Sequence, residues 1–262
     1  MTKDIKISVI ITTFNKEKFI SNTVNSCLNQ TFKNFEIIIV DTGSKDKTKN
    51  LLMKYRDQEK IKIFFISRKY KTSALNQMNA IKHGLRFCSG KVICLLDGDD
   101  LFHKNKLQFI HNFFKENKSL LCMQDVPEKL VENEIYKYKL KKFYLFKKWE
   151  QFYPTSTFSI CKSHLLQIFN QINSTKYDLL EIDLRLFFFY KIFKKKHIQT
   201  NLKLTYYVSD KHGISSKYKK FSKDWFNKRL QSHLYLKELF NNENYPYKVD
   251  FIFTKIINIF LK

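Results

Sequence analysis

Three aspartates stand within four residues of the chain, in the segment DGDD at 97–100, directly after the apolar run 91–96. Carboxylates this close repel one another unless a cation lies between them, and hard divalent ions such as Mg²⁺ and Mn²⁺ prefer oxygen ligands. The pattern therefore predicts a divalent metal that holds a diphosphate. A structural alternative is that Asp99 or Asp100 caps a following helix.

Two more polar segments follow apolar runs nearer the N-terminus. The run at 6–12 leads into TTFN at 12–15, and the run at 36–40 leads into DTGSKDKT at 41–48. In open parallel sheets, ligands bind at the edge where the carboxyl ends of the strands meet. We therefore expect all three polar segments to line one crevice.

Four apolar, β-branched runs predict the strands that place these segments, at 6–12, 36–40, 61–66 and 91–96. Apolar strands in alternation with helices indicate a parallel sheet covered on both faces. The third helix is the clearest, because apolar residues recur every three or four positions, at Ala74, Met78, Ile81, Leu85 and Cys88. The candidate helix caps are Asn15, then Ser44 or Asp46, then Thr72 or Ser73. The first hundred residues thus predict the order βαβαβαβ.

The regular alternation ends after Asp100. Strands are predicted near 120–123, 135–140, 156–160 and 198–208, and helices near 162–170, 182–194 and 222–240. No Pro- or Gly-rich linker is visible, which favours an elaboration packed on the same sheet over a separate domain.

Composition excludes several classes of protein. The 262 residues are 44% hydrophobic and 16% aromatic, which is enough apolar surface for a folded core and excludes disorder. The five cysteines are scattered and never form a C-x-x-C pair, so we expect a reducing cytoplasm rather than disulfides or a zinc site. No stretch approaches the roughly 18 apolar residues of a membrane span, and we expect no signal peptide.

The formal net charge of +24 favours an anionic partner. For a nucleic-acid-binding protein we find no RNP sequence, zinc pattern or helix-turn-helix, and DGDD would repel phosphate without a metal, so no nucleic acid is expected. A nucleotidyltransferase would carry a Gly-rich phosphate loop after the first strand, and TTFNKEKF is not one.

A membrane surface is another anionic partner. The segments YKYKLKKFYLFKKW at 136–149 and FIFTKIINIFLK at 251–262 mix lysines with aromatic and apolar residues, as suits a lipid headgroup layer. We expect peripheral contact with the cytoplasmic face of the inner membrane. The alternative is that the tail packs onto the domain through Phe251, Ile252, Ile256, Ile259 and Phe260.

In order and spacing, ISVIITTFN, EIIIVDTGSKDKT and SGKVICLLDGDD resemble family 2 glycosyltransferases with the GT-A fold. Those enzymes typically carry P-x-Y-N, V-D-[D/T]-G-S-x-D-x-T and D-x-D after the first, second and fourth strands. The resemblance covers residues 1–103, with departures at Thr12, Phe14 and Thr42. It implies an α/β fold with a mostly parallel central sheet flanked by helices and an acceptor-side α+β elaboration.

The resemblance also implies one glycosyltransferase domain at 1–262, with a nucleotide-sugar-binding half at 1–103, an acceptor-side half at 104–220 and a helical tail at 221–262. The expected activity is transfer of a sugar, with inversion, from a nucleotide diphosphate sugar to a hydroxyl. A UDP-sugar is the favoured donor, and the acceptor would be a growing surface glycan or a lipid-linked glycan, as in polysaccharide or lipooligosaccharide biosynthesis.

Site residues follow from the resemblance position by position. Thr12 and Thr13 would lie beside the base, Asp41 would bond to it, and Asp97 would approach the ribose or donor sugar. The expected nucleotide-sugar site also includes Asn15, Gly43, Ser44, Asn76 and Gly98. Asp99 would bind Mn²⁺ or Mg²⁺ with His212 as a further ligand, although most lone histidines are structural or on the surface.

Because a bound metal neutralises the departing diphosphate, one carboxylate suffices as the base for the acceptor hydroxyl. A glycoside hydrolase would instead need a paired acid and base. The candidate bases lie in DLLEIDLRL at 178–186, where Glu181 and Asp183 both qualify and we favour Asp183. The alternative is that both only favour the dipole at the start of a helix.

Overall fold

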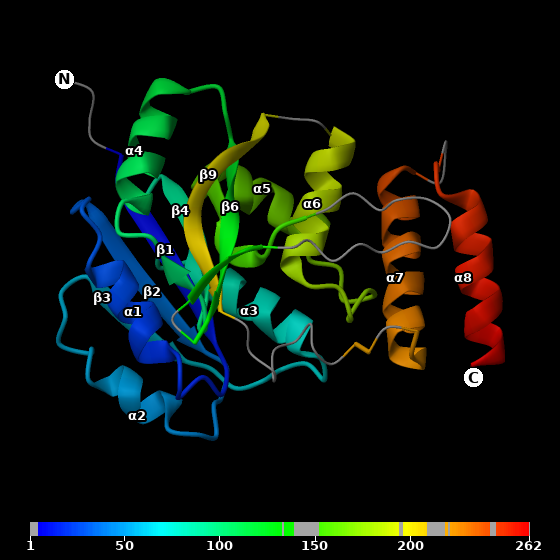
Figure 1. The fold of residues 1–262 in the computed structure, drawn as a ribbon, viewed down its shortest axis with the longest axis horizontal. Coiled ribbons are helices and arrows are strands. Elements are labelled where there is room, and N and C mark those ends of the chain that lie inside the picture. The colour runs from blue at the N-terminus through cyan, green and yellow to red at the C-terminus, as the bar shows by residue number, and fades with distance from the viewer. Residues whose placement is uncertain are drawn as a thin grey trace.

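The computed structural model describes residues 5–132, 134–138, 152–193, 196–208, 218–219, 221–241 and 245–261. Within these residues the chain forms a nine-stranded sheet with helices packed on both of its faces (Figure 1). The strand order is β3-β2-β1-β4-β8-β6-β9-β5, and β7 pairs with β6 off this path.

The N-terminal half has the predicted order βαβαβαβ. Its elements are β1 (Ile7–Thr13), α1 (Ile20–Leu28), β2 (Phe35–Asp41), α2 (Thr48–Met53), β3 (Ile61–Phe65), α3 (Ser73–Leu85) and β4 (Val92–Asp97). Every residue of β1 and β2 is buried, which explains why these runs are mostly apolar, and buried Glu36 accepts from Ser8 Oγ across the two strands (2.6 Å). The four strands are parallel, and their register sets Thr12 opposite Asp97, and Thr13 opposite Asp41.

The second half extends the same sheet. It contains β5 (Leu101–Phe102), α4 (Lys106–Glu116), β6 (Cys122–Val131), β7 (Glu134–Lys137), a 3-10 turn (Thr155–Thr157), β8 (Phe158–Cys161), α5 (Lys162–Ile172), α6 (Ile182–Phe193) and β9 (His197–Val208). Strand β8 runs antiparallel between β4 and β6, and β6 is parallel to β9. Consequently β6 and β9 point the same way as β1 to β4, and the sheet is mostly parallel, as expected.

Two apolar cores cover the two faces of the sheet. One joins α3, α5 and α6 to the sheet residues that include Ile10, Ile38 and Leu95. The other joins α1, α2 and α4 to the opposite face, which includes Val9 and Ile39. The alternation of side chains along each strand assigns neighbouring residues to opposite cores.

Two more helices, α7 (Lys223–Leu239) and α8 (Lys248–Phe260), form an antiparallel pair beside α6, with α8 outermost (Figure 1). A third cluster of aromatic and aliphatic residues packs α7 against α6. Among the described residues, every helix is too short or too polar to span a bilayer.

Several local predictions need correction. Asn15 does not cap α1, which begins at Ile20, because its backbone is left-handed at φ 54°. Thr72 stands at the N-cap of α3 without a side-chain capping bond, whereas Asp46 Oδ1 does accept from Thr48 N at the start of α2 (3.0 Å). Elements β5 and α4 were not predicted, although α4 carries a helical apolar spacing at Leu107, Ile110 and Phe114.

Candidate active site

The three polar segments expected to meet do lie together at the carboxyl edge of the sheet. Thr42 N donates to Thr13 O (3.0 Å) and Gly98 N donates to Thr12 O (2.9 Å). Thr12 Oγ1 also donates to Asp97 Oδ1 (3.4 Å). The ends of β1, β2 and β4 therefore form one continuous surface.

Side-chain hydrogen bonds join the loop after β1 to the loop after β2. Asn15 N donates to Ser44 Oγ, Lys45 N donates to Asn15 Oδ1, and Lys16 N donates to Thr48 Oγ1, each at 2.8 Å. Gly43, at φ 79°, supplies a left-handed turn that residues with a Cβ rarely adopt. Asn15, Gly43 and Ser44 therefore shape the two loops.

Asp41 is buried at the end of β2. Its Oδ1 accepts from Gly43 N (3.0 Å) and Ser44 N (2.9 Å), and its Oδ2 accepts from Ser44 Oγ. An ionised carboxylate offers about four acceptor positions, so these three bonds leave one for a donor on a ligand. Asp41 can thus order its own loop and still accept from a nucleotide base.

Asp97 lies half-buried at the end of β4. Gln77 Nε2 donates to Asp97 Oδ1 (2.6 Å), and burial together with the negative charge of Asp99 raises the Asp97 pKa to about 7. In the described part of the chain, Thr13 Oγ1 and Gln77 Oε1 are buried without a hydrogen-bond partner. Since buried polar atoms are normally paired, these two mark a place that a polar ligand would complete.

Gly98 allows the backbone after β4 to lie close to the end of β1. A Cβ at this position would lie 2.7 Å from Thr13 Oγ1 and 3.2 Å from the carbonyl oxygen of Thr12. Only glycine allows the backbone after β4 to approach the end of β1 this closely.

The carboxylates of the DGDD segment point to different partners. Asp99 Oδ2 lies 2.6 Å from Lys16 Nζ, whereas buried Asp100 accepts from Ser156 Oγ (2.6 Å) and Val208 N (3.0 Å). Burial raises the Asp100 pKa, and the charges of Asp99 and Asp97 raise it further. The three carboxylates therefore have different partners, and the described residues contain no cluster of three His, Cys, Asp or Glu placed to hold a metal.

The alternative that Asp99 or Asp100 caps a helix is wrong, because the N-cap of the following helix α4 is Asn105. Asp100 instead ties β4 to the end of β9, and Asp99 remains the carboxylate with a cationic neighbour and partial exposure to solvent (15%). Mg²⁺ is commonly held by one or two carboxylates with substrate phosphates and water, so Asp99 fits that donor set. His212 lies outside the described residues.

Both candidate bases lie at the start of α6. Asp183 Oδ1 accepts from Leu184 N (2.8 Å), and burial followed by the charge of Glu181 raises the Asp183 pKa to about 8. Glu181 is paired with Lys228 of α7, whose Nζ donates to Glu181 Oε1 (2.5 Å). The charge of Asp97 also raises the Asp183 pKa.

Asn76 forms hydrogen bonds with the backbone of the loop before α3. Its Nδ2 donates to the carbonyls of Tyr70 and Thr72, and its Oδ1 accepts from the amides of Lys69 and Tyr70. All four hydrogen-bonding positions of the amide are thereby used, so Asn76 would influence a ligand only through this loop.

Arg68 of the same loop was missed by sequence reasoning. Its guanidinium lies 4.0 Å from the ring centre of Phe14, and burial lowers its pKa. The available signal was an arginine in the loop after β3, in a chain whose cations are nearly all lysine.

A buried network under the site was also missed. Lys106 Nζ donates to Asp125 Oδ1 (2.6 Å), Thr205 Oγ1 (2.7 Å) and the carbonyl of Ser156 (2.9 Å), and Lys106 and Asp125 are both fully buried. The Ser156 hydroxyl in turn accepts from Asp97 N (3.0 Å) and donates to Asp100. The network therefore fixes the position of the DGDD segment.

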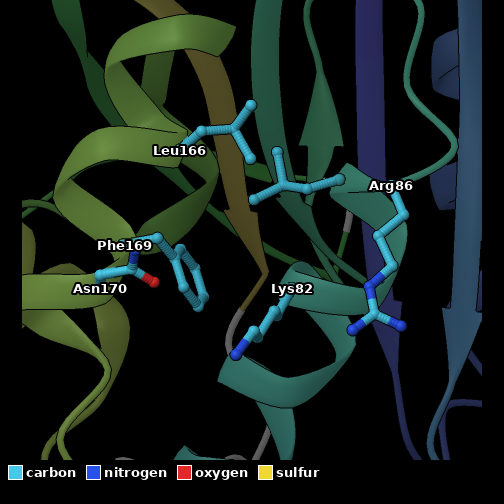
Figure 2. Close-up of a pocket in the computed structure, with 6 residues that line it drawn as sticks. Lys82, Arg86, Leu166, Phe169 and Asn170 are labelled. Atoms are coloured by element: carbon cyan, nitrogen blue, oxygen red, sulfur yellow. The ribbon is translucent and has the colours of Figure 1, made fainter.

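One cavity of about 140 Å³ lies elsewhere, between α3 and α5. Figure 2 shows Lys82 and Arg86 on one side of it and Leu166, Phe169 and Asn170 on the other. Helix α3 starts near the carboxyl edge of the sheet and runs away from it, so its last turn places this cavity at the opposite edge. None of the candidate site residues lines it.

Known proteins are similar to this chain in sequence and in fold. Residues 8–170 match the family described as Glycosyl transferase family 2. An uncharacterized glycosyltransferase of Haemophilus influenzae is 33% identical over 49% of this chain and 38% of its own. The poly(ribitol-phosphate) beta-N-acetylglucosaminyltransferase TarP of Staphylococcus aureus is 34% identical over 45% of this chain and 36% of its own.

Solved structures agree in fold. S. aureus TarS 1–349 in complex with UDP-GlcNAc has a TM-score of 0.63 at 18% identity, over 88% of this chain and 66% of that one. The mannosyltransferase PcManGT from Pyrobaculum calidifontis, in complex with GDP-Man and Mn²⁺, has a TM-score of 0.59 at 11% identity, over 97% and 70%.

The chain spans less than half the length of the curated relatives it matches. The family match nevertheless covers more than half of the chain and contains the ends of β1, β2 and β4. The sheet order and these solved neighbours give a GT-A-like fold, as expected. The chain belongs to glycosyl transferase family 2.

Proposed function

We propose that this chain transfers a sugar, with inversion, from a nucleotide diphosphate sugar to a hydroxyl group. The observation that carries the proposal is the meeting of Asp41, Asp97 and Asp99 at one edge of the sheet. A UDP-sugar is the favoured donor, because the TarS structure holds UDP-GlcNAc. The proposed acceptor is a surface glycan or a lipid-linked glycan, and the whole of 1–262 is proposed as one glycosyltransferase domain acting in the cytoplasm.

On the donor side, Thr12 and Thr13 would lie beside the base, and the open acceptor position of Asp41 would take a base N–H. Asp97 would accept from a hydroxyl of the ribose or sugar, and Thr13 Oγ1 and Gln77 Oε1, which have no partner among the described residues, would bond to the same ligand. The loops shaped by Asn15, Gly43, Ser44, Asn76 and Gly98 would hold these groups in place.

Asp99, with His212 as a further candidate, would hold Mn²⁺ or Mg²⁺. Such an ion supplies positive charge to the departing diphosphate. Lys16, at 2.6 Å from Asp99, places a second cation at the same point. Asp183 would accept the proton of the acceptor hydroxyl, because within the described residues its carboxylate forms no ion pair, whereas Glu181 is paired with Lys228.

The experiment is thermal unfolding with UDP, GDP, TDP or CMP, each with and without Mn²⁺. A ligand at a hundred times its Kd stabilises the native state by about 2.7 kcal/mol, which raises the Tm by about 5–10 °C for a chain of this size. We expect this shift for one diphosphate, only with Mn²⁺, and its loss in Asp99→Asn.

Asp57→Asn is the matched control, since Asp57 is an exposed aspartate on the surface (87%). An equal shift in Asp99→Asn and in the control would refute the metal role of Asp99. No shift with any of the four nucleotides would refute the donor site itself.

A further inference from the structure

Helix α8 packs onto the protein through its polar side. Its buried residues are Asp250, Thr254 and Asn258. Asp250 pairs with Arg229 of α7, Arg229 Nε donates to Thr254 Oγ1 (3.3 Å), and Asn258 Nδ2 donates to the carbonyl of Phe226 (3.1 Å). Polar bonds thus hold α8 against α7, the reverse of an ordinary surface helix, which buries its apolar side.

The apolar side of α8 faces solvent. Its residues, here called the apolar stripe, are Val249, Ile252, Ile256, Ile259 and Phe260, and they are between 46% and 83% exposed. Their spacing of three and four residues places them on one side of the helix. The alternative that the tail packs onto the domain through Phe251, Ile252, Ile256, Ile259 and Phe260 is therefore wrong for four of these residues, and Phe251 alone of the five joins the cluster with α7. A contiguous exposed apolar surface of this kind marks an interaction site.

Two exposed lysines border the apolar stripe. Lys248 and Lys255 lie four residues before and three residues after Ile252, so they lie next to it on the helix surface. The helix is at the outer edge of the molecule, beyond α7 (Figure 1). Nothing in the described fold therefore separates the stripe and its lysines from a flat surface.

Two observations bear on which partner binds the apolar stripe, a lipid bilayer or a second copy of the chain. A helix of 13 residues is about 20 Å long and about 10 Å wide, which offers on the order of a few hundred Å², whereas a stable protein interface buries about 800 Å² on each partner. In addition, two copies that each carry a net charge of +24 repel each other, and the same charge attracts anionic lipid. Both points favour a bilayer over a second copy of the chain.

We propose that α8 docks on an anionic lipid bilayer, with the apolar stripe inserted at the boundary of headgroups and acyl chains and with Lys248 and Lys255 at the level of the phosphates. Helices of this type lie in the plane of the interface with the apolar side about 5–10 Å deep. The lysine stems lie along apolar surface while the ammonium groups reach the headgroups. The inference stands apart from the proposed transferase activity, and its test needs neither donor nor acceptor.

The test is flotation of the full chain with vesicles of pure phosphatidylcholine, and with vesicles that contain roughly one third phosphatidylglycerol. We expect binding to the anionic vesicles. The double variant Ile252→Asn/Ile256→Asn should bind at least about tenfold more weakly. Lys248→Gln/Lys255→Gln should lose about fivefold for each lysine, on anionic vesicles only.

Leu166→Asn/Ile198→Asn is the matched control, because Leu166 and Ile198 are exposed apolar residues outside α8. All these side chains are exposed, so thermal unfolding should confirm that each variant folds. Absence of binding by the unaltered chain, or equal losses in the control and in the α8 variant, would overturn the proposal. So would light scattering that shows a dimer which Ile252→Asn/Ile256→Asn converts to a monomer, since the occupant would then be a second copy.

Discussion

Removal of either partner from the buried pair of Lys106 and Asp125 should destabilise the protein far more than removal of both. In Lys106→Met the Asp125 carboxylate keeps only the Thr205 hydroxyl (2.7 Å) of its side-chain partners. In Asp125→Leu the ammonium keeps the Ser156 carbonyl and the Thr205 hydroxyl but has lost its counter-charge. Both side chains are fully buried, so water cannot replace the missing partner.

The magnitude follows from that burial. Breaking a buried ion pair by removing one partner costs about 3–5 kcal/mol, whereas replacing both with apolar residues is often neutral. In Lys106→Met/Asp125→Leu the Thr205 hydroxyl can still donate to the Ser156 carbonyl (3.3 Å), which limits the loss to about 1–2 kcal/mol. The double-mutant cycle should therefore give a coupling energy of about 4 kcal/mol or more, above the usual range for contacting residues.

The assay is urea unfolding with linear extrapolation, followed by two spectroscopic probes to verify a two-state transition. Since Ser156 connects this network to Asp97 and Asp100, the single variants should also respond less to UDP with Mn²⁺. Single variants within about 1 kcal/mol of the unaltered chain, or a double variant whose loss equals the sum of the singles, would refute this reasoning.

One more prediction concerns the site, and another concerns the turn before β4. Asp183→Asn should keep the thermal shift with nucleotide but lose sugar transfer. In the unaltered chain, the rate of sugar transfer should rise with pH up to about 8, because burial and the charge of Glu181 raise the Asp183 pKa to that value. Because that pKa is raised from 3.8, the folded state retains a proton that the unfolded state releases. The free energy of unfolding should therefore fall as pH rises towards 8, and it should fall less in Asp183→Asn. A free energy of unfolding that does not change with pH would contradict the assignment. Gly90→Ala should lower the free energy of unfolding in urea by about 1–3 kcal/mol, because a Cβ would lie 2.6 Å from Ser8 N and 2.8 Å from the Ile7 carbonyl carbon. An unchanged urea midpoint would show that β1 can move away from the added methyl group.

Much of the local structure was predictable from the chain. The β1-to-β4 half follows from the hydrophobic pattern, because parallel strands buried on both faces need nearly continuous apolar runs and the helices between them need a period near 3.6. Helix α4 carried the same signal at Leu107, Ile110 and Phe114 and was missed. The two-residue strand β5 is too short to leave a pattern at all.

Roles of single polar residues were less predictable. Asn15 precedes a helix and has the chemistry of a cap, yet it adopts a left-handed backbone and bonds to the loop after β2. Strand β8 begins with polar neighbours and could equally have been an edge strand, but it lies inside the sheet between β4 and β6. In each case the deciding partner is distant in the chain.

The sequence by itself determined the order of the first seven elements, the family and the convergence of three polar segments, because strand ends and motif spacing are local properties. Only the tertiary structure decided which partner each carboxylate has: Asp99 pairs with Lys16, Asp100 accepts from Val208 N of β9, and Glu181 pairs with Lys228. It also turned the apolar stripe of α8 to solvent, since Arg229 and Asp250 pair only when α7 and α8 meet. Ion pairs between segments far apart leave no periodic trace in a sequence, whereas burial of a whole strand does.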